Sequence, residues 1–507
     1  MKAHLLYPDA DFNFAANLAP TTGAVIQDLE LATILDAMAQ GDDFFREVAT
    51  SVLLTMIHEP SVVRHRQEVL ADCLAHPDIV RRVYATVMGA FEDRRGLWGY
   101  SSRNPGPILF NALKQLDLFI TRLRELRRVA DDHINDVRSP GLKTLFTSLQ
   151  TDLSDEYFAE MEDHLRQLRF REGVLLSMQL ARDNTGRDYV LRSPERRRLG
   201  WWGRLTRSPR DALSFSVAPR DEAGGQALAE ITSRGINLVA NAVAQSADHI
   251  LSYFQMLRAE LAFYLGCINL RDCLAERDVE VVMPQVEPWT SRAWTAEDLR
   301  DVSLALRSTS LVVGNDVRGD RRPLTIITGA NSGGKSTFLR SVGQAQLMAQ
   351  CGMFVTARSL RVSLSNGIFT HFIREEDASM ASGRLDEELS RMDAIAATIE
   401  SGSMILFNES FAATNEREGS EIARQIVRAL LETDVRVVFV THQFDFASSF
   451  MRVAPSESLF LRAPRGEQGQ RNFRLEEAAP LPTSFGEDIY WRLGGWLGNE
   501  LPERIVS

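Results

Sequence analysis

Apolar residues recur at helical spacing through most of the first half of the chain. Residues 27–57 (QDLELATILDAMAQGDDFFREVATSVLLTMI) place them three and four positions apart, and residues 58–74 (HEPSVVRHRQEVLADCL) indicate a turn that leads into a further helix. After a break at residues 101–107 (SSRNPGP), the pattern predicts long amphipathic helices from 108 to about 180, including residues 156–182 (EYFAEMEDHLRQLRFREGVLLSMQLAR).

Helical periodicity is lost between about 184 and 225, where Gly, Pro and Arg are frequent. It returns by about residue 226. A single stripe is then formed by apolar and aromatic residues at helical spacing, namely Ile250, Phe254, Leu257, Leu261 and Tyr264. A stripe of this kind predicts that the segment packs against another helix.

After about residue 280 the pattern changes to short apolar runs that alternate with helical segments. The runs are LTIITG (324–329), MFVTA (353–357), SMILFN (403–408), VRVVFVTH (435–442) and SLFLRAP (458–464). Strands that alternate with helices predict a mostly parallel sheet covered on both faces. The expected fold class is therefore multidomain, with a mostly α-helical N-terminal half followed by an α/β domain.

Composition narrows the class of protein. Hydrophobic residues make up 44% of the 507 positions, enough for large buried cores, and no apolar run approaches the roughly 20 residues that a membrane helix requires. No secretory signal is apparent, and the four cysteines have no CxxC spacing. We therefore expect a cytoplasmic protein with reduced thiols and no membrane partner.

A phosphate-binding loop follows the first of these strands. The pattern G-x-x-x-x-G-K-S/T is met by Gly329, Gly334, Lys335 and Ser336, between an apolar run and an amphipathic helix. Glycines allow successive N–H groups to face phosphate oxygens, and the lysine supplies a positive charge. The nine residues expected to bind ATP are Gly329, Ala330, Asn331, Ser332, Gly333, Gly334, Lys335, Ser336 and Thr337.

The ends of two later strands supply the other candidate residues of this site. Asn408 and Glu409 end one strand, and His442 ends another. We expect Ser336 and Asn408 to hold Mg²⁺, Glu409 to activate water and His442 to sense the γ-phosphate. Asn408 carries no charge, so weaker Mg²⁺ binding is expected than with an aspartate. Taken alone, His442 could equally cap the next helix, whereas His371 is expected to be structural.

These motifs resemble those of the MutS family. GANSGGKST (329–337) is similar to the family's phosphate loop GPNMGGKST, and VVGNDV (312–317) is similar to its preceding Asn-Asp stretch. The segment NESFAATNEREG (408–419) resembles the family's second motif, with Thr414 and Gly419 in register, and His442 matches the family's strand-ending histidine. The resemblance is strongest over about 310–450.

Several expectations follow from this resemblance. It implies helical core, lever and clamp domains and an ABC-type P-loop ATPase domain, with ATP and Mg²⁺ bound and subunits paired through their ATPase domains. Ser379 and Ser382 are then candidates for completing the partner's site, although the family's Ser-Thr-Phe is missing here. The expected ranges are a helical core region at 1–110, a lever and clamp region at 111–285 with an arginine-rich insert at about 184–225, and the ATPase domain at 286–507.

DNA binding is expected through the insert. Residues 187–210 hold eight arginines against two acidic residues, together with Trp201 and Trp202, and they fall where the family's clamp would lie. The candidate DNA-binding residues are Arg196, Arg197, Arg198 and Arg204. A solvated loop that binds nothing is the alternative. The family's mismatch-reading Phe-x-Glu occurs here only at Phe170–Glu172, inside a predicted helix, so direct mismatch reading is not expected.

The sequence thus favours an ATP-hydrolysing, DNA-modulated dimeric clamp of MutS type that acts in DNA repair or recombination. A nucleotide-switched scaffold that binds proteins and hydrolyses little ATP is the alternative, which Asn408 and the net charge of −11 favour. A transporter-type ATPase subunit is disfavoured, because the chain has no LSGGQ stretch and no glutamine loop.

Overall fold

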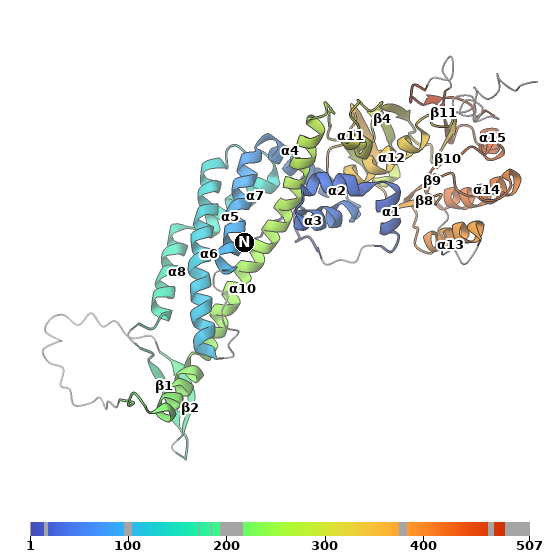
Figure 1. Ribbon diagram of the computed structural model, residues 1–507. Helices are drawn as coiled ribbons and strands as arrows, with labels where there is room; N and C mark the ends of the chain where they lie inside the picture. The colour runs from blue at the N-terminus through green and yellow to red at the C-terminus, as the bar shows by residue number, and fades with distance from the viewer. Residues whose placement is uncertain are drawn as a thin grey trace, which may run out of the picture. The chain divides into compact units, whose positions relative to one another are not determined.

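The computed structural model describes residues 2–14, 19–95, 104–171, 173–183, 185–192, 216–374, 383–464 and 471–481. The chain forms two compact units (Figure 1). The first comprises Met1–Ala3, Arg81–Asn135 and Thr144–Arg258, and the second comprises His4–Val80, Asp136–Lys143 and Ala259–Ser507. The domain limits near residues 110 and 285 stay a prediction.

The first unit is mainly helical. Its elements are most of α5 (Pro77–Arg95), α6 (Pro105–His133), most of α7 (Pro140–Asp152), α8 (Asp155–Leu168), the hairpin strands β1 (Leu176–Leu180) and β2 (Gly186–Leu191), and the first part of α10 (Glu222–Ala275). The division between the units falls inside α10, after Arg258.

A buried apolar stripe along α6 forms much of this unit's core. The stripe runs at intervals of three and four residues through Leu109, Ala112, Leu113, Leu116, Phe119, Ile120, Leu123, Leu126, Val129 and Ala130. The Phe119 ring lies 5.4 Å from that of Phe254 on α10, and Arg124 pairs with Glu162 on α8 at 2.6 Å. The stripe predicted on α10 is confirmed, since Ile250, Phe254, Leu257, Leu261 and Tyr264 are all buried.

The prediction of helix through residue 180 was wrong. Helix α8 ends at Leu168, and Phe170 and Gly173 adopt φ values of 47° and 96°, which no α-helix can accommodate. The following residues form β1, which pairs antiparallel with β2. Phe170, which we placed inside a helix, therefore lies in the turn that follows α8.

The second unit combines four N-terminal helices with two sheets. The helices are α1 (Thr22–Asp28), α2 (Leu31–Ala39), α3 (Asp43–Leu54) and α4 (Pro60–Ala75). Later helices are α11 (Val302–Arg307), α12 (Lys335–Gln350), α13 (Arg384–Ala396), α14 (Glu416–Glu432) and α15 (Phe444–Val453), with a short 3-10 helix η2 at Trp289–Ser291. The helices predicted within residues 27–74 are thereby confirmed.

The larger sheet has the strand order β12-β11-β6-β10-β9-β8. Its strands are β6 (Leu324–Gly329), β8 (Ile368–Phe372), β9 (Met404–Asn408), β10 (Arg436–Val440), β11 (Ser458–Ala463) and β12 (Glu476–Glu477). All pairings are parallel except that of β12, which confirms the predicted mostly parallel sheet. Because parallel strands end at the same edge, Gly329, Asn408 and Val440 lie along one edge of the sheet.

A second, four-stranded sheet was not predicted. Its order is β3-β7-β4-β5, with β3 at Gln285–Glu287, β7 at Ser359–Ser363, β4 at Trp294–Leu299 and β5 at Asn315–Arg318. The run MFVTA, expected to be a strand, forms only an isolated bridge between Val355 and Val282. The apolar run was correctly placed in the core, but its residues lack a neighbouring strand to pair with along their length.

Helix α12 is buried almost along its whole length, and two of its buried glutamines are hydrogen-bonded to other parts of the protein. Gln344 donates to the carbonyl of Leu29 at 2.9 Å and accepts the N–H of Val302 at 2.8 Å. Gln350 donates to the carbonyl of Ile57 at 3.1 Å. Since a buried amide is stable only with its hydrogen bonds made, these contacts attach α12 to the N-terminal helices.

The N-terminal segment around Leu5 and Leu6, before α1, is held in place by a network of buried hydrogen bonds. The carboxylate of Glu260 accepts the N–H of Leu5 at 2.6 Å, and the Tyr264 hydroxyl donates to the Leu5 carbonyl at 2.6 Å. The guanidinium of Arg66, also buried, donates to the Leu6 carbonyl at 2.8 Å. Burial raises the pKa of Glu260 to about 7, against the opposing effects of the Leu5 and Leu6 N–H groups and of Arg66.

This raised pKa predicts a loss of stability as pH rises. The folded state binds the proton more tightly than the unfolded state, so the contribution is present below pH 4.5 and is lost between about pH 4.5 and 7. A shift of this size corresponds to about 3 kcal/mol. We expect the melting midpoint of the protein to fall between pH 5 and 8 relative to that of Glu260→Gln, whose neutral amide cannot ionise.

The exposed Glu276 lies just beyond the end of the same helix and supplies the control. Glu276→Gln should leave the pH dependence of the melting midpoint unchanged. A constant offset between the protein and Glu260→Gln at every pH would show that Glu260 does not titrate in this range.

Candidate functional site

The loop between β6 and α12 has a backbone that only glycine accommodates at several positions. Gly329 and Gly334 adopt φ values of 103° and 91°. A Cβ on Gly329 would lie 2.4 Å from the carbonyl oxygen of Ala463, and one on Gly333 would lie 2.7 Å from the Ala463 side chain. At these positions a larger side chain would clash with neighbouring atoms, and at Gly329 and Gly334 the backbone conformation also favours glycine. The loop places the N-terminus of α12 at the edge of the sheet.

Lys335, the first residue of α12, is buried and faces the loop. Its ammonium donates to the carbonyl oxygens of Gly329 at 3.0 Å and Ala330 at 3.2 Å. Burial lowers the pKa of Lys335, and the charge of Glu409 opposes that effect. A buried cation held only by carbonyl groups is well placed to meet an anion, because a full negative charge binds it more strongly than a carbonyl dipole.

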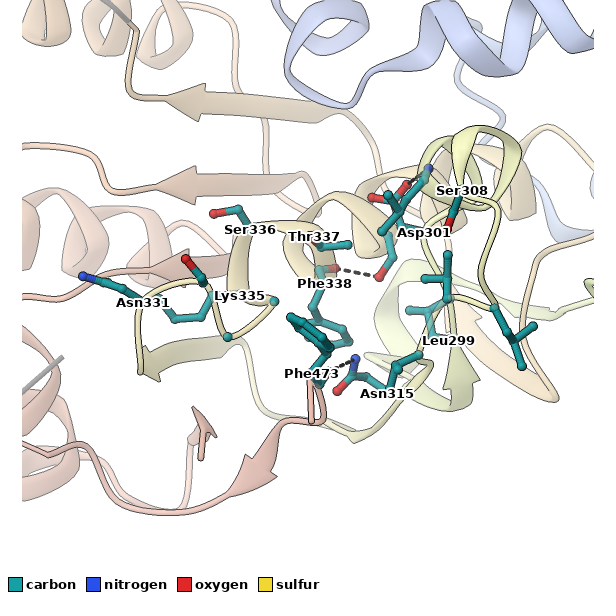
Figure 2. A pocket seen from close by; sticks show the side chains of 18 of the residues that line it. Leu299, Asp301, Ser308, Asn315, Asn331, Lys335, Ser336, Thr337, Phe338 and Phe473 are labelled. Carbon is teal, nitrogen blue, oxygen red and sulfur yellow. Dashed lines mark hydrogen bonds between the residues drawn. The ribbon is translucent and has the colours of Figure 1, made fainter. Parts of the chain in front are cut away.

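The loop forms one wall of a cavity of about 550 Å³ (Figure 2). The other walls combine apolar side chains with polar ones, the latter being Asp301, Ser308, Asn315, Ser341 and Glu409. The lining includes Leu299, Leu304, Leu311, Val312, Val313, Phe338 and Phe473. A cavity with a cationic side chain at one end and apolar side chains elsewhere suits a ligand that has both a charged and a flat apolar part.

Phe473 is placed at this cavity by Asn315, which is buried in β5. Figure 2 shows the two residues joined by a hydrogen bond, in which the Asn315 amide donates to the Phe473 carbonyl at 3.1 Å. The Asn315 side-chain oxygen in turn accepts the N–H of Leu475 at 2.7 Å. The Asn-Asp stretch was recognised from sequence, but Phe473 was missed because no motif surrounds it.

The structure brings together the predicted residues from the start of α12 and from the ends of β9 and β10. The Ser336 hydroxyl donates to the side-chain oxygen of Asn408 at 2.9 Å. Glu409 lines the same cavity as Lys335. Its carboxylate lies 2.5 Å from Nδ1 of His442 and accepts the His442 backbone N–H at 3.2 Å.

The pair formed by Glu409 and His442 is partly open to solvent, with 24% and 48% of the two side chains exposed. The hydrogen bond to Glu409 raises the pKa of His442, and burial opposes this effect. Glu409 adopts a φ of 55°, in the left-handed region that costs a non-glycine residue roughly 1 kcal/mol. Such strain is often found where a side chain must be aimed at a ligand.

Other sequence predictions have mixed outcomes. His371 is buried within the second unit, as expected of a structural residue. Thr414 donates to Glu418 at 2.7 Å on the surface. Ser379 and Ser382, and the arginines Arg196, Arg197, Arg198 and Arg204, lie outside the described residues.

Metal-ligand clusters and membrane helices are both absent from the part of the chain that the structure describes. No group of three or more His, Cys, Asp or Glu side chains there is arranged to hold a metal ion. No helix among those residues is long and apolar enough to cross a membrane. The four cysteines are free in this structure, and Cys73, Cys267 and Cys351 are buried.

Comparison with known proteins identifies two regions of the chain. Residues 58–277 match the MutS2 N-terminal domain, and residues 325–486 match MutS domain V. The chain is 32% identical over 204 residues to an endonuclease MutS2 of Lacticaseibacillus casei, an alignment that covers 39% of this chain and 25% of the relative. It is 29% identical over 276 residues to a DNA mismatch repair protein MutS of a Caulobacter species, covering 49% and 30% respectively.

A third relative is the DNA mismatch repair protein MutS 2 of Halobacterium salinarum, 26% identical over 203 residues, which are 40% of this chain and 23% of the relative. The chain therefore spans less than a third of the length of the relatives that it matches. The two matched domains together take in about three quarters of its 507 residues. On this basis, the chain belongs to the MutS family.

Proposed function

We propose that this protein is an ATPase of MutS type that binds and hydrolyses ATP in the cavity beside α12 and couples nucleotide state to DNA binding. The observation that supports this best is the convergence of Lys335, Ser336, Asn408 and Glu409 around the cavity's polar end. Lys335 and Ser336 follow the end of β6, and Asn408 and Glu409 lie at the end of β9, with β10 between these two strands. The carboxyl ends of parallel strands are where α/β proteins bind ligands.

The loop suits a triphosphate. It leads directly into the N-terminus of α12, where the unpaired N–H groups and the helix dipole favour negative charge. Lys335 would exchange its two carbonyl partners for phosphate oxygens. The apolar walls, including Phe473, would receive the base.

Mg²⁺ would be held through Ser336 and Asn408, whose side-chain oxygens are already 2.9 Å apart. When bound, the ion would supply positive charge to the β and γ phosphates. Glu409 is the group expected to orient and polarise the attacking water. His442 fixes the Glu409 carboxylate through its N–H and ring contacts and can respond to charge at the γ position.

The remaining parts of the proposal come from the family. Relatives in this family are named DNA mismatch repair proteins, which supports DNA as a partner and DNA repair or recombination as the setting. We propose that the helical regions act as core, lever and clamp, and that two subunits pair through their ATPase domains. The insert arginines Arg196, Arg197, Arg198 and Arg204 are the proposed DNA contacts, and Ser379 and Ser382 the proposed contacts to the partner's site.

One observation favours a second candidate function. Asn408 brings no charge to the expected Mg²⁺ position, and its side-chain oxygen is engaged by the Ser336 hydroxyl. A weakly held ion slows phosphoryl transfer, so the protein could act as a nucleotide-switched scaffold for protein partners with little hydrolysis.

Two substitutions should separate nucleotide binding from hydrolysis. Lys335→Ala removes a charge-assisted contact, and we expect ATP affinity by calorimetry to fall about tenfold or more. Glu409→Gln should retain ATP binding but reduce steady-state turnover about 100-fold or more, because the amide cannot act as a base.

The controls are Lys143→Ala and Glu432→Gln, whose side chains are exposed away from the cavity lining. Both variants should bind and turn over ATP as the unmodified protein does. Equal ATP affinity in Lys335→Ala and the unmodified protein would reject the cavity as the nucleotide site.

The Asn408→Asp variant tests the Mg²⁺ position. An added carboxylate should attract the ion more strongly, so the Mg²⁺ concentration needed for half-maximal turnover should fall several-fold. Titrating Mg²⁺ in a steady-state ATPase assay measures this directly. An unchanged requirement would show that residue 408 does not face the ion.

DNA coupling predicts that one DNA structure stimulates ATP turnover. Steady-state rates with duplex, branched and single-stranded DNA should differ, whereas the scaffold function predicts equal, low rates. Joint replacement of Arg196, Arg197 and Arg198 by Ala should reduce the salt slope of DNA affinity by about one for each phosphate that is no longer neutralised. Replacing the exposed Arg417, Arg428 and Arg452 instead should leave that slope unchanged.

A further inference from the structure

The turn that follows β9 presents Glu409 with an unusual backbone. Two of its residues, Glu409 and Phe411, have positive φ values of 55° and 61°. Neither is glycine, so this conformation must be held by contacts outside the turn. Ser410 and Phe411 are fully buried, which places those contacts in the protein interior.

Glu388 on α13 supplies one of these contacts. Its Oε2 accepts the backbone N–H of Phe411 at 2.6 Å, and the residue is only 1% exposed. Its other oxygen, Oε1, is buried without a hydrogen-bond partner among the described residues. Burial raises the pKa of Glu388, and the Phe411 N–H opposes that effect. Burying a carboxyl group destabilises the folded state unless the group is hydrogen-bonded. The bond from the Phe411 N–H offsets part of that cost for Glu388.

His371 on β8 extends the link from α13 to the turn. Its Nε2 lies 3.0 Å from the carbonyl oxygen of Glu388, and its Nδ1 lies 2.8 Å from the Ser410 hydroxyl. Burial lowers the pKa of His371 to about 4, so the ring is neutral near pH 7. Because a carbonyl can only accept, Nε2 carries the proton of the neutral ring. The Ser410 hydroxyl also donates to the His371 backbone carbonyl at 2.5 Å, so Ser410 contacts both the ring and the backbone of His371.

On the opposite side of the turn, the carbonyl group of Phe411 is also held by neighbouring residues. Gln443, next to His442, donates to the carbonyl of Phe411 at 3.1 Å. Gly419 on α14 packs so closely that a Cβ would lie 2.2 Å from the same carbonyl oxygen. The backbone of Phe411 is therefore held on both sides. Glu388 accepts its N–H, while Gln443 donates to its carbonyl and Gly419 packs against that carbonyl.

We propose that Glu388 is a positioning residue for ATP hydrolysis. By accepting the Phe411 N–H, its carboxylate fixes the turn at residues 409–411 and so keeps the Glu409 carboxylate against His442 at the cavity. Glu388 itself does not line the cavity, so it acts through Glu409 and does not contact the nucleotide. This inference rests on the proposed function, and it adds a residue for which no sequence motif gives a role.

If Glu388 positions Glu409, replacing Glu388 should lower the rate of ATP turnover but leave nucleotide affinity nearly unchanged. Glu388→Ala should lower kcat about 10- to 100-fold, as loss of a supporting hydrogen bond commonly does, while KM and ADP affinity change less than about threefold. Glu388→Gln retains an oxygen that can accept the Phe411 N–H, so its kcat should return most of the way to that of the unmodified protein. A residue that merely packs α13 against the sheet would not show this rescue.

Glu387→Gln is the matched control, since it makes the same chemical change one residue earlier, at a position outside the buried network. If Glu388→Ala does not fold, Ser410→Ala and Gly419→Ala disturb the same turn from other sides. Each should lower kcat with ADP affinity retained. Wild-type kcat in Glu388→Ala, or in both of these variants, would overturn the proposal.

Hydrogen–deuterium exchange without nucleotide separates this inference from the proposed function. Peptides covering residues 404–414 should exchange faster in Glu388→Ala than in Glu388→Gln or Glu387→Gln. Unchanged exchange would overturn the positioning role even if the protein hydrolyses ATP. Absence of turnover in the unmodified protein would instead overturn the proposed function, and the exchange result would still decide whether Glu388 orders the turn.

Discussion

The parallel pairing of β6, β10 and β9 is the constraint on which the site depends. It brings Gly329, Asn408 and the residues after Val440 to one edge, although they are separated by up to about a hundred positions in the chain. The burial of these strands on both faces fixes their register, because a slip would expose apolar side chains. The distances from Ser336 to Asn408 and from Glu409 to His442 follow from that register.

Features determined by local sequence were predictable. The loop from Gly329 to Thr337 depends on closely spaced glycines and a Lys-Ser pair, and the adjoining strand and helix are short-range patterns. The grouping of Asn408, Glu409 and His442 could also be expected, because a parallel sheet aligns its strand ends. The helices within residues 27–74 were predictable for the same reason as the loop, since their apolar spacing is local.

Features determined by distant contacts were not predictable. Strand β1 lay inside an apolar segment that is equally compatible with helix, whereas β2 lay in the segment where helical periodicity is lost. The positive φ values of Phe170 and Gly173, just after α8, have no strong sequence signal. Phe473 lines the cavity and is hydrogen-bonded to Asn315, 158 residues earlier, a contact that no local pattern announces. Glu388 looks like any charged residue of an amphipathic helix until its contact with Phe411 is seen.

The second unit is assembled from three stretches of chain, His4–Val80, Asp136–Lys143 and Ala259–Ser507. Two long segments of the first unit separate them in the sequence. Arg340 on α12 pairs with Glu30, 310 residues earlier, and α12 also contacts α3. During synthesis, the N-terminal helices would therefore leave the ribosome long before their partners exist. Until the last third of the chain has emerged, the apolar faces of these helices would be exposed to solvent or covered by a chaperone. The segment from β6 onward, cut from the rest, would lack the helices that cover α12, and it would be a poor candidate for expression as an independent domain.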